Sequence, residues 1–167
     1  VAQETVARYP DRVSGLVLFA TTPAFGGRDD KFKDDFLAHR LKPLDAGKSP
    51  ADIAPNLVGG MFSEATPEAV KAKAVASMAA ISADSYRAAL TCIVTFNQVE
   101  NLGRIACPTL VLAAEADTLS PPRTMGRMAE RIPGARFVTL DGVGHLANFE
   151  DPPRFNAALT DFLATFD

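Results

Sequence analysis

Three short apolar runs constrain the fold more than any other feature of this 167-residue chain. They cover residues 13–20 ("VSGLVLFA"), 107–115 ("CPTLVLAAE") and 135–141 ("ARFVTLD"). Each run is continuously apolar rather than alternating, which is typical of parallel strands that are covered on both faces. Segments with a helical apolar period lie between and after the runs. Strands that alternate with helices through right-handed crossovers predict the α/β class, with a doubly wound parallel sheet.

Two of the segments that follow strands carry clear helix start signals. The segment 120–132 begins with Ser120 as the expected N-cap and Pro121 at the first helical position. The segment 151–166 repeats this design, with Asp151 as its expected N-cap. We expect the buried face of this last helix to consist of Phe155, Leu159, Phe162, Leu163 and Phe166.

A long insert separates the first predicted strand from the other two. We therefore expect core structure in residues 1–21, a helical cap in residues 22–103, and the remaining core strands and helices in residues 104–167. The insert contains no convincing strand pattern. Its apolar spacing predicts four helices, within residues 28–41, 49–62, 66–81 and 82–96.

Two polar side chains follow consecutive predicted strands. Asp117 comes after the run 107–115, and His145 comes after the run 135–141, in the loop "DGVGHLANFEDPP". In open α/β sheets, function gathers at the carboxyl ends of the strands, where these two loops can meet. A carboxylate that accepts a hydrogen bond from an imidazole fixes its tautomer and stabilises the imidazolium. We therefore expect a hydrogen bond of about 2.7–2.9 Å between Asp117 and His145.

Other interpretations of these residues remain open at this point. Asp117 could instead cap the helix that follows it, although Ser120 is better placed for that role. Asp141 is a competing acid partner for His145, but its place at the end of a strand suits a turn. His39 lies among charged residues, where a solvated helix face is the default interpretation.

Three segments resemble the α/β-hydrolase superfamily. "IACPTLVLAAEADTLSPP" and "LDGVGHLANFEDPPRFNAALTDFL" are similar to its last two strand–loop–helix units, most of all to 3-oxoadipate enol-lactonase-like members. "VAQETVARYPDRVSGLVLFA" resembles the helix and strand that follow the family's nucleophile elbow. The resemblance implies the C-terminal part of that fold, with Asp117 as the orienting acid and His145 as the general base.

The elbow pattern G-x-S-x-G does not occur in the chain. By resemblance, the nucleophilic serine lies a few residues before Val1, and the oxyanion hole also lies upstream. We therefore expect this chain alone to be inactive, and we expect its partner to be the N-terminal part of the same hydrolase.

The first predicted strand also suggests a partner. In the family it is an interior strand, so without its upstream neighbour one edge of residues 13–20 lacks a hydrogen-bonding partner. We expect that edge to pair with the N-terminal part, or otherwise with a second copy in a homo-oligomer. We also expect Val1, Val6 and Tyr9 on the first helix to be exposed.

The resemblance implies cleavage of a small carboxylic ester or lactone through an acyl-enzyme. The alternatives are other chemistry of this superfamily (a C–C hydrolase, a dehalogenase or an epoxide hydrolase), or a hydrolase-like module that acts through protein contacts without catalysis. Acyl transfer needs only a nucleophile, a base and an oxyanion site, so no cofactor is implied.

Composition excludes several other functions. The net charge is −3 and there is no basic tract, which argues against binding to nucleic acid or to a membrane surface. The apolar runs are too short to cross a bilayer. With two histidines and no clustered cysteines, a metal site is not expected. Cys92 and Cys107 do not form a CxxC pair, so we expect two buried thiols in a reducing compartment, hence a cytoplasmic location.

Overall fold

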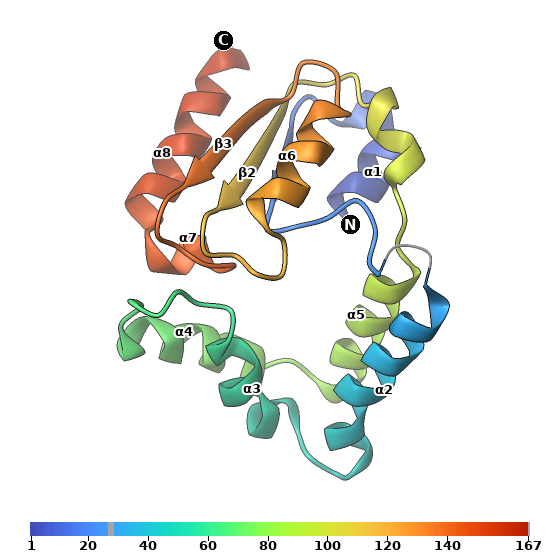
Figure 1. The fold of residues 1–167 in the computed structure, drawn as a ribbon, viewed down its shortest axis with the longest axis vertical. Coiled ribbons are helices and arrows are strands. Elements are labelled where there is room, and N and C mark those ends of the chain that lie inside the picture. Colours follow the sequence, from blue (N-terminus) through green and yellow to red (C-terminus); the bar gives the residue numbers. More distant parts are fainter. Residues whose placement is uncertain (27–28, 167) are drawn as a thin grey trace. The chain divides into compact units, whose positions relative to one another are not determined.

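A computed structural model describes residues 1–26 and 29–166. It contains a three-stranded sheet in the order β1-β2-β3, and all of its strands are parallel. The strands are β1 (Leu16–Phe19), β2 (Thr109–Ala114) and β3 (Arg136–Leu140) (Figure 1). They fall within the three apolar runs, and they confirm the predicted α/β class and parallel sheet.

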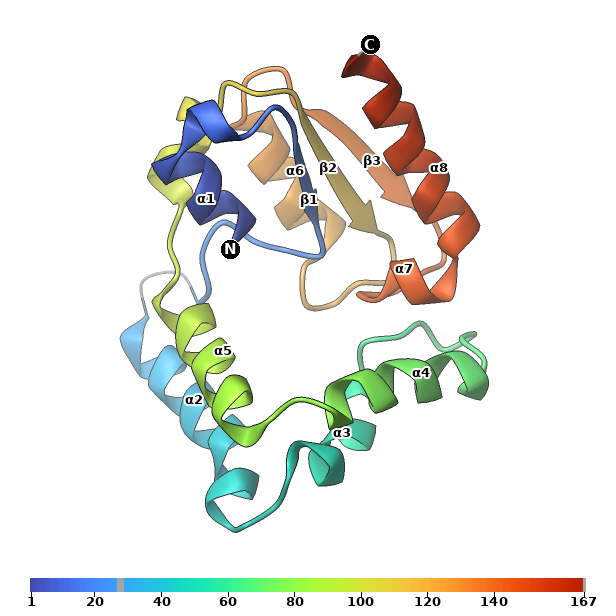
Figure 2. The same ribbon diagram turned by 180° about the vertical axis from the view of Figure 1, so that it is seen from behind.

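β2 is the central strand of this sheet (Figure 2). Leu16 of β1 pairs with Thr109, and Arg136 of β3 pairs with Leu110. Every residue of β2 is buried. This burial explains why the strand is apolar from Leu110 to Ala114, because helices cover both of its faces.

One face of the sheet is covered by α1 (Ala2–Arg8) and α6 (Pro122–Glu130). The core on this face is formed by side chains from both helices and from β1 and β2. It includes Val6, Leu16, Leu18, Val111, Ala113, Met125, Met128 and Ala129. The predicted exposure of Val6 is therefore wrong: its side chain faces the sheet and is 4% exposed. Val1 and Tyr9 are exposed, as predicted.

The opposite face is covered by α8 (Pro152–Leu163), which begins after the predicted N-cap. Asp151 accepts a hydrogen bond from the Arg154 amide at 3.0 Å. The buried face of α8 is shorter than predicted, because Leu163 is 60% exposed. A step of about 100° from the buried Phe162 turns Leu163 away from the sheet. Phe166, which lies in a terminal 3₁₀ turn, is also exposed.

The start of α6 also differs from the prediction. The N-cap is Pro121, with no side-chain cap, and the first helical residue is Pro122. Ser120 is buried, and its amide donates to the Asp117 side chain instead. Because α6 begins one residue later than predicted, Ser120 lies before the N-cap position and does not cap the helix. A short helix that the sequence did not indicate, α7 (Ala147–Glu150), follows His145.

The chain divides into two compact units. The first unit consists of Val1–Pro23, Met61–Ala65 and Gln98–Asp167, and therefore contains the sheet. The second unit consists of Ala24–Gly60 and Thr66–Asn97.

The second unit is helical, as the insert pattern predicts. Its helices are α2 (Asp30–Asp45), α3 (Pro50–Gly59), α4 (Glu68–Ala79) and α5 (Ala83–Thr95). Within the unit, α2 lies beside α5 and α3 lies beside α4 (Figure 1). Leu44, Tyr86 and Leu90 form its buried apolar cluster.

The two cysteines are free thiols, but only one of them is shielded. Cys107 is half-buried, whereas Cys92 is exposed on α5, so the prediction of two buried thiols is wrong. No helix among residues 1–26 and 29–166 is long and apolar enough to span a membrane.

Candidate active site

Asp117 lies in the turn that follows β2. Its amide donates to the carbonyl of Ala114, the last residue of that strand, at 3.1 Å. The side chain is fully buried. Its Oδ1 accepts hydrogen bonds from the amides of Leu119 at 2.8 Å and Ser120 at 2.9 Å. One carboxylate oxygen therefore holds the turn together, and the other remains for a second partner.

That partner is His145, in the loop after β3. Its Nδ1 lies 2.9 Å from Asp117 Oδ2, so the hydrogen bond expected from the sequence is present. Because the partner is a carboxylate, Nδ1 is the donor in this bond and Nε2 is left as the acceptor of the neutral ring. The His145 side chain is 21% exposed, so the ring is packed but still reachable.

Backbone hydrogen bonds join the two loops that carry this pair. The amide of Glu115 donates to the carbonyl of Leu140, and the amide of Ala116 donates to that of Val143, both at 2.9 Å. The Glu115 side chain accepts from the Gly142 amide at 2.8 Å. The pairing between β2 and β3 thus continues into the loops, and it sets the positions from which the acid and the histidine meet.

Asp117 remains ionised despite its burial. Burial by itself raises the pKa of this carboxyl group. The hydrogen bonds from His145, Ser120 and Leu119, together with the charge that His145 can carry, outweigh burial and lower the pKa below its usual value. Asp117 therefore carries a full negative charge at neutral pH. This charge allows it to stabilise a protonated His145 ring.

The alternative acid, Asp141, does not occupy this position. Its backbone carbonyl accepts a hydrogen bond from Arg154 Nη2 at 3.0 Å. The next residue, Gly142, has a φ of +71°, a conformation that favours glycine, so this stretch makes a turn. Among the described residues, the carboxylate bonded to His145 is that of Asp117.

The sequence reasoning missed a second group of residues beside His145. Glu150, at the end of α7, accepts hydrogen bonds from the Gly144 amide at 2.7 Å and from the Ser63 hydroxyl at 2.5 Å. An acid five residues after the loop histidine was a visible signal for Glu150. Nothing local in the sequence indicates that Ser63 would join it.

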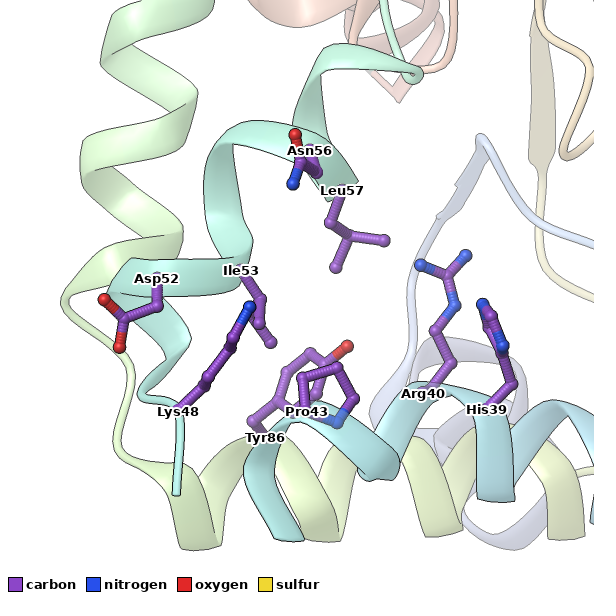
Figure 3. A pocket seen from close by; sticks show the side chains of 9 residues that line it. All are labelled: His39, Arg40, Pro43, Lys48, Asp52, Ile53, Asn56, Leu57 and Tyr86. Atoms are coloured by element: carbon purple, nitrogen blue, oxygen red, sulfur yellow. The ribbon is translucent and has the colours of Figure 1, made fainter. Parts of the chain in front are cut away.

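The second unit contains a separate cavity of about 290 Å³ (Figure 3). Arg40 and Lys48 give it two cationic groups, and Tyr86 forms part of its wall. Burial raises the pKa of Tyr86, and the charge of Arg40 partly opposes this rise. His39 also lines the cavity but is exposed, as expected for a solvated helix face. In the described part of the chain, the histidine bonded to a carboxylate is His145, so the acid–base site lies in the first unit.

Comparisons with known proteins identify the family of the chain. A protein of Mycobacterium tuberculosis, provisionally named a non-heme bromoperoxidase, is 28% identical over 99% of this chain. A thermophilic esterase from Thermogutta terrifontis is 27% identical over 99% of the chain, with a TM-score of 0.86. The enol-lactonase of Burkholderia xenovorans has a TM-score of 0.81 over 98% of the chain, and at 22% identity it shares the fold.

The chain spans less than two thirds of each of these proteins, namely 64%, 61% and 61% of their lengths in the same order. The sequence profile described as "Alpha/beta hydrolase family" matches residues 1–158, which is most of the chain. This match confirms the resemblance at the level of the superfamily, and the parallel sheet with its covering helices agrees with it. The chain therefore belongs to the alpha/beta hydrolase family.

Proposed function

We propose that this chain provides the acid–base half of a hydrolase that acts on small carboxylic esters or lactones. The observation that carries the proposal is the 2.9 Å hydrogen bond between His145 Nδ1 and the buried carboxylate of Asp117. The pair lies at the carboxyl ends of two adjacent parallel strands, where active sites of open α/β sheets are found. In this proposal His145 is the general base and Asp117 is the acid that orients it.

The nucleophile in this proposal is a serine in an N-terminal part of the same protein, before Val1. His145 Nε2 takes the proton of the serine hydroxyl as the serine oxygen attacks the ester carbonyl, and it returns that proton to the leaving alkoxide. Nε2 then takes a proton from water as the water oxygen attacks the acyl-enzyme, and it passes that proton to the serine oxygen as the bond to the acyl group breaks and the acid is released. Asp117 stabilises the imidazolium in both steps without taking its proton.

Two observations support esters or lactones as the substrate class. The esterase that matches the whole chain is 27% identical to it. Acyl transfer also requires a base that can take up and release a proton. In the Asp117–His145 pair, a buried, ionised acid holds Nδ1 of the imidazole and leaves Nε2 to exchange protons.

The test uses the full-length protein with p-nitrophenyl acetate and a panel of small lactones. We expect His145→Ala to lower kcat/KM by at least about 10³-fold, and Asp117→Asn to lower kcat by about 10²–10⁴-fold, because the ring loses its orienting charge. Asp141→Asn is the matched control and should stay within about twofold of the parent enzyme, since that side chain does not hold the ring. Turnover that persists in His145→Ala would contradict the proposal.

A further inference from the structure

Glu150 joins two segments that are far apart in the sequence. Its Oε1 accepts from the Gly144 amide at 2.7 Å, and its Oε2 accepts from the Ser63 hydroxyl at 2.5 Å and from the Ser63 amide at 3.2 Å. Both segments belong to the first unit, in which residues 61–65 pack with the sheet-bearing part of the chain. One half-buried carboxylate therefore connects the residue before His145 to a segment more than eighty residues upstream.

The backbones of these two segments lie in direct contact at Gly144. A Cβ atom at Gly144 would lie 2.8 Å from the Met61 carbonyl oxygen, 2.8 Å from the Ser63 nitrogen and 2.9 Å from Glu150 Oε1. Glycine is thus required here by close approach rather than by an unusual φ angle. The close approach leaves no room for a side chain at Gly144. The Glu150 carboxylate accepts hydrogen bonds from both segments at this contact.

The contact also restrains a part of the loop that would otherwise be free to move. Two glycines, Gly142 and Gly144, precede His145, and glycine has the largest conformational freedom to lose. Asp117 anchors the ring of His145 at Nδ1. A single hydrogen bond does not fix the orientation of the ring, which also depends on the position of the loop backbone. On the other side of His145, α7 places Glu150 so that its carboxylate returns to Gly144. The carboxylate therefore closes the loop around the histidine.

We propose that Glu150 is a positioning residue for His145. Its carboxylate fixes the backbone on both sides of the histidine, so that the imidazole stays aligned with Asp117 while Nε2 exchanges protons. This inference rests on the proposed role of His145 as general base. A carboxylate suits the task because hydrogen bonds to a charged acceptor are shorter and stronger than neutral ones.

The experiment compares four variants of the full-length protein, each assayed well below its own melting temperature. We expect Glu150→Ala to lower kcat by about 10–100-fold with KM within about twofold, because a small misplacement of a catalytic group slows the chemistry more than binding. Glu150→Gln keeps an acceptor for the Gly144 amide but turns an NH2 group toward the Ser63 amide, so its kcat should lie between those of Glu150→Ala and the parent. Ser63→Ala removes the hydroxyl donor and keeps the carboxylate, so its kcat should also lie between them. Glu130→Ala, an exposed acid on α6, is the matched control and should leave kcat unchanged.

A second measurement separates positioning from stability and from the proposed function itself. The downfield proton resonance of His145 Nδ1–H reports its hydrogen bond to Asp117 without turnover. We expect this resonance to broaden or move upfield in Glu150→Ala, and to change less in Glu150→Gln, which keeps the acceptor for the Gly144 amide. A lower melting temperature with unchanged kcat and an unchanged resonance would overturn the inference and leave Glu150 as a stabilising residue. Activity that survives in His145→Ala would instead overturn the proposed function, while the resonance would still test the positioning.

Discussion

Asp117 divides its two carboxylate oxygens between two elements. Oδ1 holds the turn before α6 through the amides of Leu119 and Ser120, and Oδ2 holds the ring of His145. Burying a carboxylate lowers the stability of the fold unless hydrogen bonds compensate for its lost hydration. The same bonds that make the group tolerable in the interior therefore also keep it charged.

This lowered pKa predicts how stability depends on pH. A group with a lower pKa in the folded state stabilises the fold fully above its unfolded pKa, and this stabilisation is lost as the pH falls through the folded pKa. We expect the free energy of unfolding of the parent protein to fall more steeply than that of Asp117→Asn as the pH drops from about 5 through and below 3.8, the usual pKa of an aspartate. Urea unfolding at a series of pH values measures the free energy of unfolding of both proteins. Parallel curves would contradict the conclusion that hydrogen bonds keep the buried Asp117 carboxylate ionised.

The sequence indicated this pair because both residues follow apolar runs, and the ends of neighbouring parallel strands must meet. It left capping and orienting as alternatives for Asp117, and could not indicate that one carboxylate would bond both His145 and the amides just ahead of α6. That arrangement depends on the direction in which the buried carboxylate points, which no local pattern encodes. Glu150 and Ser63 were missed for a related reason, because their contact is made by tertiary packing.

Among the elements, the strands and most helices follow directly from hydrophobic period. β2 was predictable because a strand buried on both faces has an unbroken apolar sequence. The end of α8 could not be predicted in this way, because Leu163 matches the apolar spacing but lies outside the face of the helix that contacts the sheet. The short α7 has too few residues to show a period at all.

The loop between β3 and α7 has no room for an added methyl group at Gly144. We expect Gly144→Ala to lower the free energy of unfolding by about 1–3 kcal/mol, because its Cβ would be forced against backbone atoms of the segment 61–65. Gly103→Ala is the matched control, since its Cβ would meet only the Arg131 carbonyl at an ordinary 3.8 Å. That control should stay within about 0.5 kcal/mol of the parent. Equal effects of the two substitutions would show that the close approach at Gly144 does not constrain the loop.

For the whole molecule, the central question is which residue His145 activates. The chain spans 61–64% of the proteins that it matches along its whole length. β1 pairs with β2 along one edge, and among the described strands it has no partner along the other. We propose that the N-terminal part of the protein pairs with this free edge and brings the serine to the carboxyl end of the sheet, beside His145.

Labelling with a fluorophosphonate, which reacts with activated serines, is the most direct test of whether His145 activates a serine before Val1. The full-length protein is treated with the reagent, and the modified residue is identified by mass spectrometry of its peptides. We expect one labelled serine before Val1, a label suppressed at least about 10²-fold in His145→Ala, and no label on residues 1–167 prepared alone. A labelled serine within residues 1–167, or labelling of His145→Ala at the rate of the parent protein, would contradict the proposed role of His145.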